Sequence, residues 1–97
     1  MLARNNYEVV FIVDSQLEEE ERNNVISRIK DLISEHASLE NVNEWGNRKL
    51  AYEIADRTEG YYVLIDFNAS SDFPLELERI LKITDGVLKY LILKKDK

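Results

Sequence analysis

Arg48 and Lys49 are the residues of this chain whose types and spacing favour the binding of an anion. They stand side by side in a segment that otherwise favours a β-sheet, so a rigid element is expected to present two cations. Such a pair suits contact with a phosphate backbone. On composition alone, the two residues could equally be an ordinary solvated pair near a turn. The one other feature of the sequence that favours phosphate binding is the basic C-terminal end of the chain.

Catalytic chemistry has few candidates in this chain. His36 could act as a nucleophile in phosphoryl transfer, but it is expected at a helix end, where a cation interacts favourably with the helix dipole. No glycine-rich phosphate loop accompanies it, and residues 14–17 lack the arginine that an acylphosphatase carries after its first strand. The acidic run 18–21 is best interpreted as a solvated helix start. We therefore expect no enzyme activity, no metal, no cofactor and no small-molecule substrate.

Size and charge limit the other possibilities. The 97 residues, 44% of them hydrophobic, suit a single domain over residues 1–97, and no cysteine is present for a disulfide or a thiolate metal site. No segment has the length or composition of a signal peptide or membrane span, so a soluble cytoplasmic protein is expected. The net charge of -6 arises within residues 14–44, and in the rest of the chain the acidic and basic residues are equal in number. A polarised surface that binds RNA on one side is compatible with this distribution.

The pattern of the chain predicts the order βαββαβ. Strands are expected at residues 7–13, 39–54, 60–67 and 87–93, with a bend or bulge near Gly46 and a turn at residues 56–59. Ser15 and Glu18 have the spacing of a capping box for a helix of about 20 residues, and residues 71–74 open a second helix. Apolar residues recur at intervals of three and four in both segments and predict one buried stripe on each helix: Val25, Ile26, Ile29, Leu32, Ile33 and His36 or Ala37 on the first, and Leu77, Ile80, Leu81 and Thr84 on the second. This order predicts an α+β, ferredoxin-like split βαβ fold, with two helices on one face of a four-stranded antiparallel sheet.

The alternation of side chains predicts which face of that sheet the helices leave open. A charged side chain is expected on the open face, and every second residue of a strand shares its face. Val10 and Ile12 therefore lie on the open face with Glu8, and Tyr62 and Leu64 lie there with Asp66. With Leu91 these residues would form an apolar patch suited to a permanent partner, although single exposed apolar residues are also common. Trp45 is expected to pack at the strand bend or to join an interface.

The predicted hairpin, which consists of Glu44–Ile54 (EWGNRKLAYEI) and Gly60–Phe67 (GYYVLIDF), resembles the bacterial small-subunit ribosomal protein S-six family. The resemblance extends from the opening strand at Tyr7 to the closing strand at Lys94. It implies a non-catalytic protein that binds the central domain of small-subunit ribosomal RNA cooperatively with ribosomal protein S-eighteen. It also implies the basic RNA contacts Arg4, Arg48, Lys49, Lys82 and Lys89, with the partner contacts Val10, Ile12, Trp45, Tyr62, Leu64 and Leu91.

A stand-alone RNA-recognition module that binds single-stranded RNA is the alternative, since it shares this topology and stacks bases on aromatic residues of its third strand. Gly60 and Tyr61 match the start of its motif. Val63 and Asp66 stand where further aromatic residues belong, and an acidic residue there would repel RNA. Base stacking on Tyr61 or Tyr62 is therefore disfavoured by the sequence.

Overall fold

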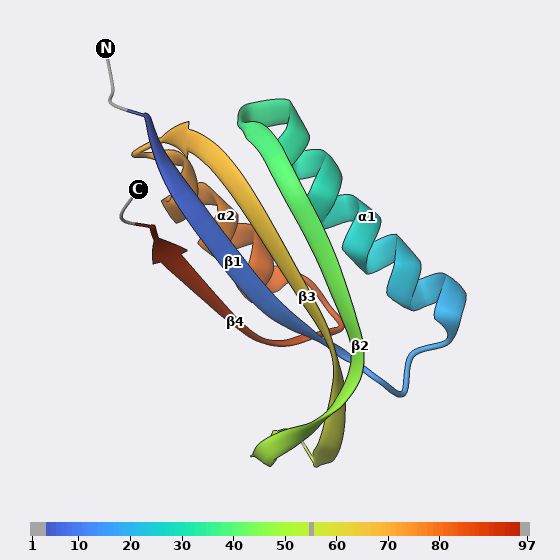
Figure 1. Cartoon of the computed structure of the whole chain (residues 1–97). Coiled ribbons are helices and arrows are strands. Elements are labelled where there is room, and N and C mark those ends of the chain that lie inside the picture. The colour runs from blue at the N-terminus through green and yellow to red at the C-terminus, as the bar shows by residue number, and fades with distance from the viewer. Residues whose placement is uncertain (1–3, 55, 96–97) are drawn as a thin grey trace.

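The computed structural model describes residues 4–54 and 56–95, and within them the predicted order of strands and helices is confirmed. The elements are β1 (Arg4–Asp14), α1 (Glu19–His36), β2 (Ser38–Ile54), β3 (Arg57–Ser70), α2 (Phe73–Ile83) and β4 (Val87–Lys94). The strands form an antiparallel sheet in the order β2-β3-β1-β4, and both helices lie against the same face of it (Figure 1). The split βαβ architecture is therefore the one expected.

β1 lies inside the sheet, because β3 pairs with one of its edges and β4 with the other. Phe11 is opposite Val63 of β3 and Tyr90 of β4. Residues directly opposite each other in an antiparallel pair point to the same face, so this register carries the alternation of β1 across three strands. The register also shows which face each lysine of β4 occupies. Lys89 is opposite Ile12 and belongs to the open face, whereas Lys94 is opposite Tyr7 and belongs to the helical face.

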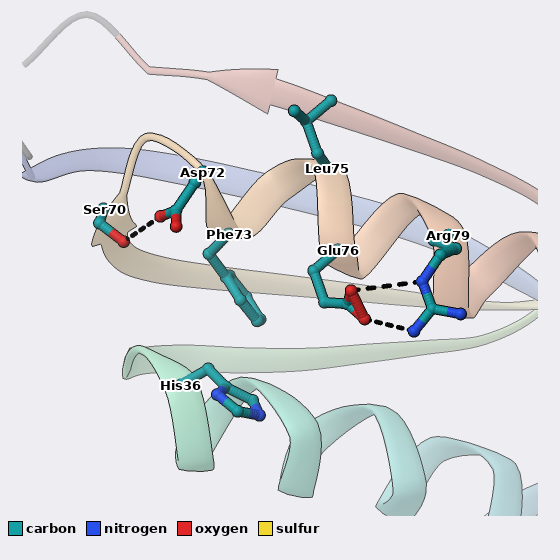
Figure 2. A pocket seen from close by; sticks show the side chains of 7 residues that line it. All are labelled: His36, Ser70, Asp72, Phe73, Leu75, Glu76 and Arg79. Carbon is teal, nitrogen blue, oxygen red and sulfur yellow. Dashed lines mark hydrogen bonds and ion pairs between the residues drawn. The ribbon is translucent and has the colours of Figure 1, made fainter.

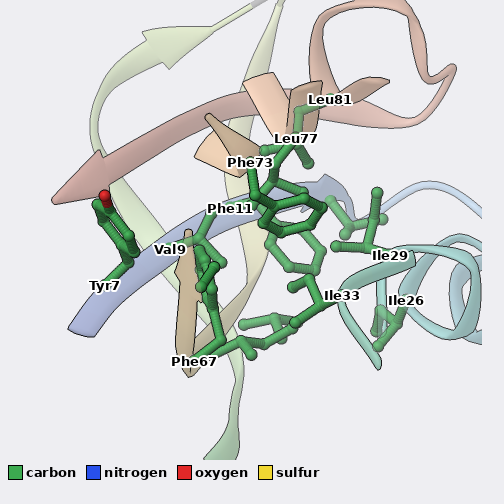
Figure 3. Packing of buried hydrophobic residues seen from close by; sticks show 14 residues of the cluster. Tyr7, Val9, Phe11, Ile26, Ile29, Ile33, Phe67, Phe73, Leu77 and Leu81 are labelled. Carbon is green, nitrogen blue, oxygen red and sulfur yellow. The ribbon is translucent and has the colours of Figure 1, made fainter. Parts of the chain in front are cut away.

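The core fills the space between the sheet and the helices (Figure 3). Phe67 is fully buried, and its ring lies 5.6 Å from that of Tyr7 and 5.7 Å from that of Phe73. The helical stripes predicted by periodicity are confirmed, with three isoleucines buried on α1 and two leucines on α2: Ile26, Ile29, Ile33, Leu77 and Leu81. Among the described residues, neither helix is long and apolar enough to cross a membrane.

β2 and β3 form a long hairpin that extends past the other strands (Figure 1). The predicted irregularity near Gly46 is confirmed, because the register shifts between Glu44 and Gly46 and the φ angle of Gly46 is +83°. A glycine tolerates such a left-handed backbone because it has no Cβ. Bulges increase the local twist of a strand pair, which helps to turn the far end of the hairpin toward the open face.

Two local predictions were wrong. Ser15 does not cap α1, because its hydroxyl donates instead to the backbone carbonyl of Glu59 at 3.2 Å, and the helix begins four residues later with three acidic residues in its first turn. The turn predicted at residues 56–59 is shorter, since β3 already begins at Arg57. In the case of Ser15 a contact with a distant segment overrides the local signal of the chain. The turn is shortened by a local pair, since Ile54 is already opposite Arg57.

Candidate nucleic-acid and protein interface

An apolar row crosses the open face of the sheet. The register places Val10 opposite both Leu64 of β3 and Leu91 of β4. Val10 and Leu64 are half-buried, whereas Leu91 is 54% exposed. The sequence interpretation missed Leu93, which is 45% exposed and belongs to the same face, because its partner on β1 is Glu8. Together these residues form a contiguous apolar surface of the kind that marks a protein contact.

An aromatic pair continues this surface toward β2. The rings of Trp45 and Tyr62 lie 6.2 Å apart and are inclined by only 16°. Trp45 is nevertheless 46% exposed, so its ring is not buried in a core at the strand bend. Large amphipathic rings that remain accessible beside an apolar patch are common anchors of protein interfaces. Of the two roles expected for Trp45, the interface role agrees better with this geometry.

Ile12 is a correction to the predicted patch. It was expected to be exposed on the open face, but it is only 7% exposed. Leu50, in the part of β2 that extends past β1, is itself 7% exposed and lies close to Ile12 beside Gly60. Because Gly60 has no side chain, the methyl group of Ile12 occupies the space that a Cβ would need. The hairpin thus covers one end of the open face, and Ile12 is not available to a partner in this conformation.

Cations surround that covered end. Arg48 and Lys49 are exposed on β2, and the Nε atom of Arg48 donates to the carbonyl oxygen of Trp45 at 3.3 Å. Lys89, on the open face of β4, donates to the hydroxyl group of Tyr52 and lies 4.9 Å from the centroid of that ring. The contact brings the hairpin and β4 together. Tyr52 is 58% exposed, and the sequence interpretation did not identify it as a contact residue.

The remaining two predicted cations lie elsewhere. Arg4 is exposed at the beginning of β1, eight positions from Ile12, which corresponds to roughly 26 Å along a strand. Lys82 is exposed in the last turn of α2, within the helical layer. The five predicted RNA contacts therefore do not form one continuous patch. Arg48 and Lys89 belong to the open side near the end of the hairpin, whereas Lys49, opposite Glu59, is exposed on the other side of β2. Arg4 and Lys82 are separate from all three.

An ion pair joins the base of the hairpin to β1. The Nε atom of Arg57 donates to Oδ1 of Asp14 at 2.9 Å, and both side chains are mostly covered. The hydrogen bond from Arg57 lowers the pKa of Asp14 below its ordinary value. A second hydrogen bond, from the backbone N–H of Gln16 to the same carboxylate, acts in the same direction. This ion pair therefore attaches the part of the hairpin that carries Arg48 and Lys49 to the end of β1.

The aromatic residues of β3 do not form the stacking platform of an RNA-recognition module. Tyr61 belongs to the helical side, where the guanidinium of Arg22 lies 4.2 Å from its ring centroid. Its hydroxyl donates to Glu44 at 2.8 Å, and this bond raises the pKa of Tyr61. Tyr62 is on the open face but already stacks on Trp45. The geometry therefore gives no support to the alternative function.

His36 lines a hollow of about 570 Å³ between the end of α1 and the start of α2 (Figure 2). Its ring stacks on that of Phe73, with 5.9 Å between centroids. The charged groups of the hollow are already paired, since Arg79 donates to Glu76 and the hydroxyl of Ser70 donates to Asp72. Residues 4–54 and 56–95 contain no group of three or more side chains arranged to hold a metal ion. The packing of His36 agrees with the structural role expected for it.

Comparisons with known proteins agree with the fold. A family model described as "Ribosomal protein S6" matches residues 6–94. The small ribosomal subunit protein bS6 of Alkaliphilus oremlandii is 47% identical, over 96% of this chain and 99% of its own. That of Thermoanaerobacter pseudethanolicus is 52% identical, over 94% and 97%. The crystal structure of 30S ribosomal protein S6 from Thermotoga maritima is similar with a TM-score of 0.90 and 32% identity, covering 96% of this chain and 89% of that one.

Proposed function

This chain belongs to the ribosomal protein S6 family, and from that premise we propose that it is a structural protein of the small ribosomal subunit in the bacterial cytoplasm. The family is a non-enzymatic component of the ribosome. We further propose that the chain binds the central domain of small-subunit ribosomal RNA together with ribosomal protein S-eighteen. The apolar surface would contact the partner protein, and the cations would contact the RNA.

One observation carries the finer proposal: the open face combines an apolar row with cations at the adjoining hairpin. Leu91 and Trp45 are about half exposed, and Arg48 and Lys49 stand on the strand that carries Trp45. A protein that met Trp45 and Leu91 would therefore bring its own charges beside Arg48 and Lys49. Two proteins that border one RNA segment neutralise more phosphates together than either does alone.

The net charge of -6 is a reason to expect such cooperation. An acidic chain gains little from non-specific attraction to RNA, since that attraction depends on the number of phosphates that it neutralises. Several carboxylates lie in the first turn of α1, which belongs to the helical layer and not to the open face: Glu19, Glu20 and Glu21. The open face can therefore approach RNA while most of this charge stays on the opposite side of the sheet.

The experiment that tests the proposal is a titration of a central-domain RNA transcript with this protein, alone and with S-eighteen. The affinity is expected to rise at least tenfold when the partner is present, and equal affinity in both titrations would refute a shared surface. Trp45→Ala should reduce that gain without unfolding the chain. Leu75→Ala is its matched control, because Leu75 is 74% exposed on α2, away from the open face.

A second series tests the cations. The double substitution Arg48→Ala with Lys49→Ala should weaken RNA binding in the joint complex and reduce the slope of log affinity against log salt by about 2, as expected when two phosphate contacts are lost. Arg28→Ala with Lys30→Ala removes the same charge from α1 and is the control. An equal loss in both double variants would mean that net charge, and not the hairpin, governs binding.

A further inference from the structure

A network of hydrogen bonds holds the guanidinium of Arg4 at the end of the sheet opposite the tip of the hairpin. Its Nε atom donates to Oδ1 of Asn68 at 2.8 Å, and its Nη2 atom donates to the backbone carbonyl of Asn68 at 2.9 Å. Nη2 also donates to the hydroxyl of Ser38 at 3.4 Å. The arginine side chain is exposed, yet its charged group is fixed by two strands other than its own.

A second bond fixes the residue that holds Arg4. The Nδ2 atom of Asn68 donates to Oδ1 of Asn6 at 2.9 Å. An asparagine amide has a donor side and an acceptor side. With its nitrogen turned to Asn6, its oxygen faces Arg4, whereas the reverse orientation would bring an NH₂ group against the guanidinium. Arg4 has only donors and requires the oxygen of Asn68, and the bond to Asn6 holds Asn68 in that orientation because Asn6 presents its own oxygen to the amide nitrogen of Asn68.

The register of the sheet explains why these polar groups meet. Asn6 is opposite Asn68 on β3, Asn68 is opposite Ser38 on β2, and Arg4 is opposite Ser70. All of these positions belong to the open face, on which Val10 and Leu64 also lie. Asp66, two positions along β3 from Asn68, is paired with Lys95 at 3.3 Å. Because Lys95 neutralises Asp66, that carboxylate competes less with a phosphate for the guanidinium of Arg4.

The bonds of Arg4 leave part of its donor capacity unused. A guanidinium has N–H groups on Nε, Nη1 and Nη2, and the bonds described above use the Nε and Nη2 atoms. Among the described residues, no hydrogen bond of Nη1 is found. We propose that Asn68, oriented by Asn6, is a positioning residue that presents Nη1 of Arg4 to a phosphate of the RNA. A preorganised arginine loses less side-chain entropy on binding than a mobile one.

This inference rests on the proposed function, in which Arg4 is one of the expected RNA contacts, and adds the residues that position it. Arg4 lies roughly 26 Å from the level of Ile12, where the cations of the hairpin begin. Between the two ends, Val10, Leu64 and Leu91 are apolar, and the cation beside them, Lys95, is already paired with Asp66. RNA would thus be held at both ends of the open face, while the partner protein occupies its middle.

The test is the affinity of the full chain, mixed with S-eighteen, for the central-domain transcript. Arg4→Ala should weaken binding about fivefold and lower the salt slope by about 1, as for one phosphate contact. Asn68→Ala should weaken it about two- to threefold although it removes no charge. Asn6→Ala should act in the same direction. Asn5→Ala is the matched control, because Asn5 bonds to the hydroxyl of Tyr7 and not to the network, and its affinity should be unchanged.

The decisive comparison is Asn68→Ala made in the Arg4→Ala background. A positioning residue loses its effect once the group it positions is gone, so the double variant should bind no more weakly than Arg4→Ala alone. If Asn68→Ala still weakens binding there, or has no effect in the wild-type background, the inference is overturned. Thermal melts of each variant separate a loss of folding from a loss of binding.

Failure of the proposed function would have a different signature. If the unsubstituted protein with its partner does not bind the transcript, the function itself is wrong and the inference falls with it. If that complex binds and responds to Arg48→Ala with Lys49→Ala but not to Arg4→Ala, only the inference is wrong. A third variant, Asn68→Asp, keeps an acceptor for Arg4 but neutralises its charge, and it should weaken binding at least as much as Asn68→Ala.

Discussion

The helical and open faces of the sheet carry apolar residues at the same spacing on the same strands, but they differ in what covers them. On the helical face of β1 and β3, Val9, Phe11 and Val63 have no exposed surface. On the open face, Val10 and Leu64 are half-buried and Leu91 is 54% exposed. The two sets differ little in hydrophobicity, so periodicity alone cannot tell a folding surface from a docking surface.

The difference lies in the position of the charges and rings. Glu8 and Asp66 stand opposite each other on the open face, whereas the helical face contains stacked and edge-on rings around Phe67. A carboxylate beside an apolar row keeps that row hydrated in the free protein, and a partner must displace the water. Equivalent substitutions on the two faces should therefore affect different equilibria, namely folding on the helical face and assembly on the open face.

The largest expected effect separates the faces directly. Phe67→Ala should lower the free energy of unfolding by about 3–5 kcal/mol, because it opens a cavity among fully buried rings. Leu64→Ala, three positions away on the same strand, should cost only about 1 kcal/mol but should weaken the complex with the partner protein. Urea denaturation and partner titration of both variants measure the two quantities. Similar unfolding costs for the two variants would break the distinction between the faces.

A smaller effect concerns the part of the open face that the hairpin covers. A Cβ atom at Gly60 would lie 2.2 Å from the Cγ2 atom of Ile12 and 3.4 Å from Leu50. Gly60→Ala should therefore destabilise the chain by about 2 kcal/mol, as overpacking does. Thr58→Ala, at an exposed position of the same strand, is the control for urea denaturation.

A double substitution tests the origin of that cost. Because Ile12→Ala removes the methyl group that the new Cβ meets, Ile12→Ala with Gly60→Ala should be less destabilising than the sum of the two single changes. Strict additivity would mean that the close approach of Gly60 to Ile12 is not the cause of the destabilisation.

The smallest expected effect is on the pH dependence of stability. The pKa of Asp14 is lower in the folded chain than its ordinary value of 3.8, because Arg57 donates to it. The resulting stabilisation is fully present above the pKa of the unfolded state and is lost as the pH falls through the lower folded pKa. Asp14→Asn should melt a few degrees below the wild type at pH 7, and this gap should narrow below about pH 4. A gap that is constant down to pH 2 would contradict the assignment.

The sequence was sufficient for features that depend on periodicity and local chemistry. The order of elements, the isoleucine stripe of α1 and the bulge near Gly46 were predicted correctly. The sequence was insufficient where segments far apart in the chain meet. Ile12 has the same alternation signal as Val10, and only the return of Leu50 over the sheet buries it. In the same way, Ser15 has the spacing of a helix cap but bonds to Glu59, 44 residues away.

In the candidate site, too, the sequence predicted what depends on neighbouring residues and missed what depends on contacts between distant strands. A pattern could identify Arg48 and Lys49 as neighbouring cations, since neighbours in a chain remain neighbours in a strand. It could not find Tyr52 beside Lys89 or Asn68 beside Arg4, because both contacts depend on strand register. Lys82 was grouped with the other cations because the family resemblance implied it, and the fold places it in the helical layer.

The bulges of β2 set a limit on how this protein can vary in length. Pairing of β2 with β3 shifts by one residue between Leu39 and Asn41 and again between Glu44 and Gly46. Each shift marks one extra residue of β2, Glu40 or Trp45, that has no partner on β3, so loss of that residue would restore regular pairing and leave Arg48 on the same side of the strand. Loss of a residue between the two bulges would instead exchange the two sides of the segment that follows. Among related proteins, single-residue deletions in this strand should therefore be confined to the bulges.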